Sequence, residues 1–461
     1  MASTKAFRPV THVIFDMDGL IFDTENIYNA TFEAALNEFG KTYTDELKLK
    51  TMGKRPLEYA QLIVDGNHLS ITAEEWLKKT DPMLLEAFPD CEYMPGIPKL
   101  IHHLYKNNVP IAVATSSGDA NFQAKVSKNH GKIFEMFSHI IKGSMVENGK
   151  PAPDIFLKAA KDFSTPADPT NCLGFEDSPS GVKSARSAGM QCVMIPDDIT
   201  PAEKRTEATV VLKTAHDFVP EAFGLPAYDY KPVTHVIFDM DGLLLDTSHF
   251  YSKISRELLA KHGKKPDMEF KMAMKGRRHV EIAPAMIEHY DLPMTVDEIG
   301  EWYSERLGAV VSECTVKPGV WRLVKHLKKH GIPMAVGTSS AQEGFSRKTV
   351  NHGELFSNFN HVVNGSDPEV KEGKPAPDCF RITADRFPDK PDYAKCLVFE
   401  DAPNGVEAAV AAGMQVVMVP ERNNVAPELT RKATQMLDTI VDFRPEDFGL
   451  PPFEECGKGD S

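Results

Sequence analysis

The residues with the clearest chemical potential are two aspartates one residue apart, Asp16 and Asp18, in the run DMDG. The apolar letters HVIF precede Asp16, which predicts that both acids follow a buried strand. Carboxylates placed there cost free energy unless they bind something. Two acids in one turn can hold a hard cation through oxygen. Taken alone, the motif also fits a plain turn or a calcium loop.

Further polar side chains follow other apolar runs in the same part of the chain. Thr115 ends the run IAVAT, Glu176 and Asp177 follow NCLGF, and Lys150 lies in GKPAPD. Parallel sheets bind ligands beyond the carboxyl ends of their strands, so we expect these groups to meet at one edge. The acids suit magnesium, the lysine opposes their charge, and the threonine can donate a hydrogen bond.

This combination is suited to phosphoryl transfer, in which catalysis consists mostly of positioning and charge neutralisation. An aspartate can accept the phosphoryl group as an aspartyl-phosphate. A second acid can then serve as general acid and base.

The whole motif set occurs twice. THVIFDMDGL at Thr11 to Leu20 returns letter for letter at Thr234 to Leu243, an offset of 223 residues. The other motifs recur at the same offset or one residue more: ATSS and GTSS, GKPAPD twice, and FED twice. A solenoid would repeat every ~20–50 residues, so the pattern indicates a tandem duplication. Chance does not readily produce the ordered set in both copies.

The repeat divides the chain into two copies and a linker. Copy one spans 1–226, the linker 227–233 and copy two 234–461. The linker is short and contains Pro232, so we expect the copies to lie close together and to be able to pack on each other.

Each copy is predicted to be an α/β unit: a doubly wound, Rossmann-like parallel-sheet core. Short apolar runs without alternation are typical of strands buried on both faces, and helical patterns separate them. The segment directly after the first strand departs from this alternation and has apolar residues at helical spacing. It predicts a helical cap inserted there, at about 25–92 in copy one and 248–313 in copy two.

Composition and charge exclude some classes of binding partner and indicate a cellular location. Apolar residues make up 42% and charged residues 26% of the 461, as in globular proteins, and the net charge is −14. Such acidity argues against nucleic acid polymers and membranes as partners. The seven cysteines form no CxxC pair, which argues against a disulfide framework or a zinc site. With no signal-peptide pattern at the N-terminus, we expect a cytoplasmic protein.

These motifs resemble those of the haloacid-dehalogenase superfamily. The longer sequence runs around them are similar to those of its pseudouridine-5′-phosphatase group. The resemblance rests on THVIFDMDGLIFDTE, MGKRPLE, VPIAVATSSG, GKPAPDIFLKAAKDF and KCLVFEDAPNGVEAAVAAGMQVVMVP. It covers almost all of both copies and implies a cap domain of the type inserted after the first motif.

The resemblance also implies roles for the motif residues of each copy. The nucleophiles would be Asp16 and Asp239, and the general acid/base residues Asp18 and Asp241. Phosphoryl oxygens would be held by Thr115, Ser116, Ser117, Thr338, Ser339 and Ser340. The neutralising lysines would be Lys150 and Lys374. The Mg²⁺ shell would involve Asp16, Asp18, Glu176 and Asp177, and in copy two Asp239, Asp241, Glu400 and Asp401.

Substrate choice is expected to come from the cap, where basic residues can grip a phosphate or a carbonyl group. They lie in GKR and GRR: Lys54, Arg55, Arg277 and Arg278. Ordinary solvated basic residues are the alternative. The copies also differ at the start of the cap, where Glu25 in copy one is replaced by Ser248 in copy two.

The expected function is a magnesium-dependent phosphatase acting on a small phosphorylated metabolite, with pseudouridine 5′-phosphate or a related nucleotide as the first substrate hypothesis. In this superfamily, the second aspartate favours phosphate chemistry over carbon–halogen cleavage. A sugar- or polyol-phosphate phosphatase and a phosphomutase remain alternatives, as does a non-catalytic scaffold role for one copy.

Overall fold

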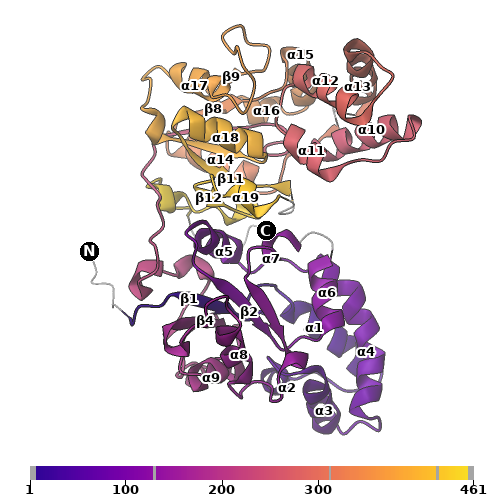
Figure 1. The fold of residues 1–461 in the computed structure, drawn as a ribbon, viewed down its shortest axis with the longest axis vertical. Helices are drawn as coiled ribbons and strands as arrows, with labels where there is room; N and C mark the ends of the chain where they lie inside the picture. Colours follow the sequence, from indigo (N-terminus) through magenta and orange to yellow (C-terminus); the bar gives the residue numbers. More distant parts are fainter. Residues whose placement is uncertain (1–6, 128–130, 311–312, 422–424, 455–461) are drawn as a thin grey trace. The chain divides into compact units, whose positions relative to one another are not determined.

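The computed structural model describes residues 7–127, 131–310, 313–421 and 425–454. The chain divides into two compact units, Met1–Tyr228 and Asp229–Ser461, which are described separately (Figure 1). The division falls inside the segment 227–233.

Unit one is built on a six-stranded parallel sheet in the order β3-β2-β1-β4-β5-β6. The strands are β1 His12–Phe15, β2 Ile111–Thr115, β3 His139–Lys142, β4 Cys172–Glu176, β5 Gln191–Met194 and β6 Val210–Val211. The central strand β1 pairs with β2 and β4, with Phe15 opposite Val113 and Phe175. The chain order reverses at this point, which brings the carboxyl ends of β1, β2 and β4 side by side.

Helices cover both faces of this sheet. They are α5 Ile97–Lys106, α6 Asp119–Ser127, α7 Gly131–Phe134, α8 Asp154–Lys161 and α9 Pro179–Ser187. Val13 and Phe15 pack in the core with residues of α5, whereas Ile14 packs with residues of α8 and α9. Successive strand residues point to opposite faces, so β1 has to be apolar throughout.

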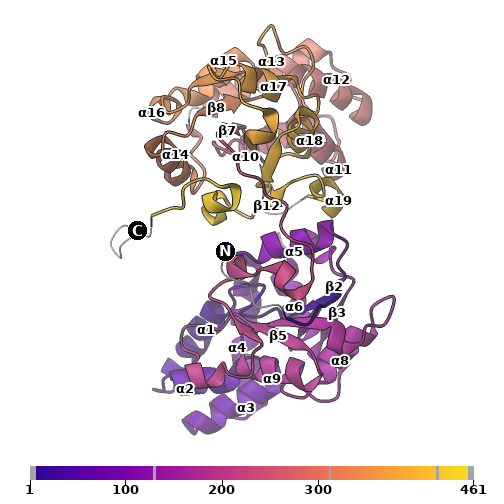
Figure 2. The ribbon, with the colours of Figure 1, turned by 90° about the vertical axis from the view of Figure 1, so that its left-hand side faces the viewer.

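The cap of unit one consists of α1 Glu25–Asn37, α2 Asp45–Thr51, α3 Pro56–Asn67 and α4 Ala73–Ala87. Figure 2 shows these helices grouped together at the lower left of the unit. Their side chains form a separate apolar cluster that includes Phe32, Tyr59 and Trp76. Local sequence sets where they begin: Thr72 and Glu75 form a reciprocal capping box at the start of α4.

Unit two repeats this plan, with the strand order β12-β11-β10-β7-β8-β9. Its strands are β7 His235–Phe238, β8 Met334–Gly337, β9 His361–Val363, β10 Cys396–Glu400, β11 Gln415–Met418 and β12 Gln435–Met436. Its cap helices are α10 Ser248–Lys261, α11 Met268–Met274, α12 His279–Tyr290 and α13 Val296–Val310. Its other helices are α14 Val320–Lys329, α15 Gln342–Thr349, α16 Gly353–Phe356, α17 Asp378–Asp385, α18 Pro403–Ala412 and α19 Pro427–Thr430.

The predicted fold class is confirmed: two α/β units with all-parallel sheets. The outer strands β3 and β6, and their counterparts β9 and β12, were not among the predicted strands. Strands β6 and β12 have only two residues each, and β3 and β9 are only partly buried. Among the described residues, no helix combines the length and apolar character needed to cross a membrane. The described cysteines are buried free thiols: Cys91, Cys172, Cys192, Cys314, Cys379 and Cys396. Cys456 lies outside the described residues.

Candidate active site

The turn that follows β1 brings Asp16 and Asp177 together. The backbone N–H of Asp16 donates to the carbonyl of Phe175 at 2.9 Å, which ties the end of β1 to β4. Gly19 completes the turn with a φ of +75°, and a Cβ there would lie 2.3 Å from Asp177 Oδ2. The glycine is therefore required both for the left-handed backbone and for the close approach of the carboxylate.

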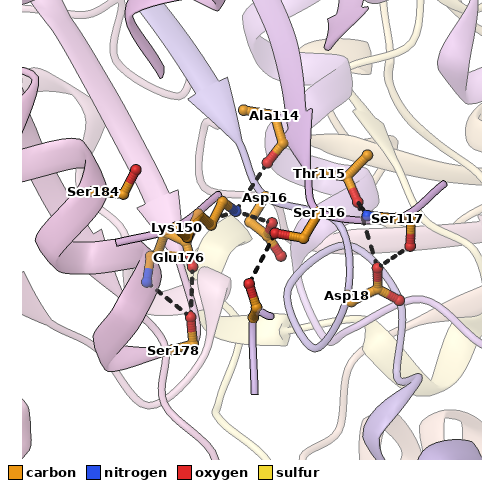
Figure 3. Close-up of polar contacts among 12 residues, drawn as sticks. Asp16, Asp18, Ala114, Thr115, Ser116, Ser117, Lys150, Glu176, Ser178 and Ser184 are labelled. Atoms are coloured by element: carbon orange, nitrogen blue, oxygen red, sulfur yellow. Dashed lines mark hydrogen bonds and ion pairs between the residues drawn. The ribbon is translucent and has the colours of Figure 1, made fainter. Parts of the chain in front are cut away.

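A buried lysine connects the first and last motifs (Figure 3). Lys150 Nζ forms an ion pair with Asp16 and lies 2.6 Å from Glu176 Oε1 and 3.0 Å from the Ala114 carbonyl. All three charged side chains are buried. Residues from three strand ends and the loop before α8 thus meet at one point, as expected from the parallel sheet.

The buried carboxylates of this group lie close enough together to raise one another's pKa. Burial raises the pKa of Asp16 to about 7, with Glu176 and Asp18 adding to the rise and Lys150 opposing it. Burial, together with the charges of Asp16 and Glu176, also raises the pKa of Asp177. One ammonium does not neutralise three acids, so a further positive charge would stabilise the ionised site.

Oxygen atoms of Asp16, Glu176 and Asp177 lie within 4.8 Å of one another, as do those of the corresponding residues of unit two, Asp239, Glu400 and Asp401. Among the described residues, no lysine, arginine or histidine forms an ion pair with Asp177. A hard divalent cation prefers carboxylate oxygens, so the donor set fits Mg²⁺.

Asp18 faces a different set of partners. It accepts hydrogen bonds from Thr24 Oγ1 at 2.9 Å and from Ser117 Oγ at 2.7 Å, and it forms an ion pair with Lys125. Burial alone would raise the pKa of Asp18, but the Lys125 charge and these hydrogen bonds outweigh it and lower the pKa. The pKa of Asp16 is therefore raised and the pKa of Asp18 is lowered, although both residues lie in one turn.

Lys125 was not among the predicted site residues. It lies on α6, its side chain is fully buried, and its Nζ lies 4.3 Å from the centre of the Phe88 ring. Its sequence context is that of a surface helix, so the only available signal was its recurrence as Lys348 at the offset of 223.

Unit two reproduces both networks. Lys374 Nζ lies 2.6 Å from Asp239 and 2.7 Å from Glu400, and burial raises the pKa of Asp239. Asp241 accepts hydrogen bonds from Thr247 at 2.8 Å and from Ser340 at 2.6 Å.

The hydroxyl residues after β2 have distinct positions. Thr115 is buried, and its Oγ1 lies 3.5 Å from Asp18 and accepts from the Ser117 N–H. Ser116 turns toward the cap and donates to the Gly53 carbonyl at 2.8 Å, as Ser339 donates to Gly276 at 2.7 Å. The equivalents of Thr115 and Ser117 in unit two are Thr338 and Ser340, which are linked in the same way.

The basic residues of the cap divide into two kinds. Lys54 lines a cleft above the aspartates and donates to the Lys150 carbonyl at 3.3 Å. Arg55 donates to the carbonyls of Val146 and Glu147, both at 3.0 Å, and so holds the loop before Lys150.

In unit two, Arg278 pairs with Glu281 at 2.6 Å and packs over Gly373, so it too lies on the core loop. Arg277 has a buried Nε with no hydrogen-bond partner among the described residues. A substrate contact for any of these cap residues stays a prediction.

A small cleft lies over the aspartates of unit one. Its floor carries Asp16, Asp18 and the two serines, and its walls come from the cap. The cap residues are largely aromatic or apolar: Tyr28, Phe32, Tyr43, Met52, Pro56 and Tyr59. The cleft thus combines carboxylates and hydroxyl groups from the core with aromatic and apolar side chains from the cap.

In each α/β unit the paired aspartates and the buried lysine meet at the edge of the parallel sheet, and residues 13–195 and 236–419 both match the family of haloacid dehalogenase-like hydrolases. The chain belongs to this family. Together with its named relatives, the family identifies the chain as an enzyme, a phosphoric monoester hydrolase.

Similar proteins align with half of the chain. A probable pseudouridine-5′-phosphatase of Drosophila melanogaster is 45% identical over 229 residues, 49% of this chain and 99% of that protein. The (DL)-glycerol-3-phosphatase 2 of Arabidopsis thaliana is 45% identical over 227 residues, 48% of this chain and 94% of that protein. Among solved structures, CbbY from Rhodobacter sphaeroides with phosphate matches at a TM-score of 0.40 and 23% identity, covering 45% of this chain and 96% of that one.

Proposed function

We propose that both copies are magnesium-dependent phosphatases that hydrolyse small phosphomonoesters through an aspartyl-phosphate. The observation that carries the proposal is the buried set Asp16, Lys150, Glu176 and Asp177, which recurs in unit two with the same pairings. A scaffold role for one copy would not require a second complete set of buried charges, which are costly to retain.

Asp16, Glu176 and Asp177 would hold Mg²⁺, with Asp239, Glu400 and Asp401 doing so in copy two. When bound, the cation supplies positive charge for the phosphate oxygens and favours the ionised form of these acids. Asp16 then has the ionised oxygen needed to attack phosphorus, and the P–O bond to the leaving alcohol breaks as the Asp16–phosphorus bond forms.

Asp18 would act as the general acid of the first half-reaction and as the general base of the second. In its protonated form it would donate to the leaving oxygen, and as a carboxylate it would take the proton of the water that splits the aspartyl-phosphate. Lys125, Ser117 and Thr24 hold it as the carboxylate in the present geometry, which is the form that the second half-reaction uses. Lys150 would keep Asp16 in place and balance the charge of the phosphate.

Pseudouridine 5′-phosphate is the first substrate candidate, because the motifs and a relative at 45% identity point to it. Glycerol 3-phosphate is the second, because a relative with the same identity is named for it. The aromatic wall of the cleft favours the nucleotide, since a base offers a flat ring to pack against aromatic side chains.

The test uses the full chain, the two candidate substrates and fructose 1-phosphate, each with Mg²⁺ and with a chelator. We expect Mg²⁺-dependent phosphate release, reduced in D16N and in D239N and abolished in the double variant. Acid quenching with ³²P-labelled substrate should trap label that hydroxylamine removes and that the double variant lacks. No release from any substrate would refute the proposal, and transfer to a second hydroxyl of the substrate would indicate a phosphomutase.

A further inference from the structure

The two copies differ at a cap residue that lies against the acidic cluster. Copy one has Met52 at the end of α2, and copy two has Lys275 directly after α11, at the same offset of 223 as the DMDG runs. Lys275 Nζ lies 2.7 Å from Asp401 Oδ2 and 3.9 Å from Glu421 Oε2. The side chains of Lys275 and Asp401 are 13% and 3% exposed, so the pair is largely shielded from water.

The backbone around Lys275 is fixed to the core. Asn404 Nδ2 donates to the carbonyls of Ala273 at 2.8 Å and Lys275 at 2.7 Å. Gly276 lies so close to the core that a Cβ there would be 2.9 Å from Ala402 Cβ. Lys275 is therefore held over Asp401 by neighbouring contacts, which distinguishes it from a mobile surface lysine.

A second difference between the copies also removes an acidic group from beside the cluster of copy two. Glu25 of copy one packs against the glycine of the DMDG turn, with its Cγ 3.4 Å from the position of a Gly19 Cβ. Ser248 takes this place in copy two, with its Oγ 2.9 Å from the position of a Gly242 Cβ. Copy two thus lacks one acid that copy one has beside the cluster and gains one ammonium.

We propose that the two metal sites are unequal: copy one binds a divalent cation tightly, and copy two binds it weakly because the cation must compete with the Lys275 ammonium for Asp401. The inference rests on the proposed function, in which these acids hold Mg²⁺. Like charges a few ångströms apart in a shielded site repel strongly, so replacing Lys275 should have a measurable effect on affinity. In copy two, Lys275 supplies part of the positive charge that copy one obtains only from its metal.

The experiment measures binding of Mn²⁺ alone to the full chain, with free Mn²⁺ followed by electron paramagnetic resonance. We expect a tight and a weak class of site in the natural sequence. D177N should remove the tight class and D401N the weak one, which ties each class to its copy.

In the D177N background, Lys275→Met should tighten the remaining site by about tenfold or more. Methionine occupies this position in copy one, so the variant is expected to fold. Lys265→Met removes the same charge from an exposed residue of the same cap and should leave the affinity unchanged. In the D401N background, Glu25→Ser should weaken the copy-one site.

Equal Mn²⁺ affinity of both copies, or a Lys275→Met site that binds no more tightly, would overturn the inference and leave the proposed function standing. Absence of Mn²⁺ binding at both copies would overturn the inference and the proposed function together. These readouts do not depend on turnover, so an inactive copy can still be assessed.

Discussion

The Nζ of Lys348 lies 2.6 Å from Oδ1 of Asp241, the second aspartate of the second DMDG run. Lys125 forms the same ion pair with Asp18 in the first unit. Each lysine also donates to the serine that contacts the aspartate, at 2.9 Å to Ser117 and 2.7 Å to Ser340. Both copies therefore fix the proposed acid/base group through a buried cation that belongs to none of the sequence motifs.

The first prediction concerns Lys125 as a positioning residue. In the D239N background, where only copy one turns over, Lys125→Met should lower kcat about 10- to 100-fold with little change in KM, because Asp18 loses the partner that orients it. Lys125→Arg should restore part of kcat, since a guanidinium keeps the charge. Steady-state kinetics at saturating Mg²⁺ check this. An unchanged kcat in a correctly folded Lys125→Met protein would show that the ion pair has no part in turnover.

The second prediction concerns the stability contributed by Lys150. Lys150→Met leaves Asp16 and Glu176 buried without their shared cation. It should lower the free energy of unfolding of unit one by about 3–5 kcal/mol. The matched control is Lys158→Met, whose ion pair with Asp162 is 2.7 Å long and 32% exposed on both sides. It should cost less than about 1 kcal/mol. Urea unfolding in the presence of a chelator measures both; similar losses for the two variants would contradict the buried-cation argument.

The sequence was sufficient to predict the parallel sheets, the caps and the convergence of four motifs, because those features depend on runs of apolar residues and on where strands end. It was not sufficient for Lys125, since nothing local separates it from Lys132, which is 41% exposed. Burial of a helix lysine is decided by the cap residues packed over it, such as Phe88. The same holds for Lys275: the exchange with Met52 is visible in the repeat, but its partner Asp401 is distant in sequence.

The third prediction concerns the pH dependence of stability without metal. Burial first, and then the charges of Asp18 and Asp197, raise the pKa of Glu25 from 4.5 to about 8. Between these values the folded state binds more protons than the unfolded state, so the contribution of Glu25 to stability falls as the pH rises through this window. Glu25→Gln should therefore stabilise the chelator-treated protein by about 3–4 kcal/mol more at pH 8 than at pH 5.

Thermal unfolding of both proteins from pH 5 to pH 8 tests this difference. Glu33→Gln provides the control, because Glu33 lies on the same helix α1 with a side chain that is 51% exposed. Its effect should stay within about 0.5 kcal/mol at every pH. A Glu25→Gln effect of equal size at pH 5 and pH 8 would mean that Glu25 is ionised across the whole range.

The fourth prediction is that the two copies prefer different substrates. The cleft wall of copy one includes Phe32 and Tyr59, whereas the same offset places Ser255 and Ile282 in copy two. The Tyr59 hydroxyl is buried with no hydrogen-bond partner among the described residues, so a polar group of a bound ligand could satisfy it.

Kinetics of D239N and D16N, which isolate copies one and two, should give kcat/KM ratios between pseudouridine 5′-phosphate and glycerol 3-phosphate that differ by about tenfold or more. Tyr59→Ile should move the ratio of copy one toward that of copy two, because it removes both the ring and the unpaired hydroxyl. Leu57→Ile, on the same helix α3 but 52% exposed, should leave the ratio unchanged. If D16N and D239N give the same ratio, the cleft wall does not select the substrate, and the charge difference around Lys275 becomes the main functional distinction between the copies.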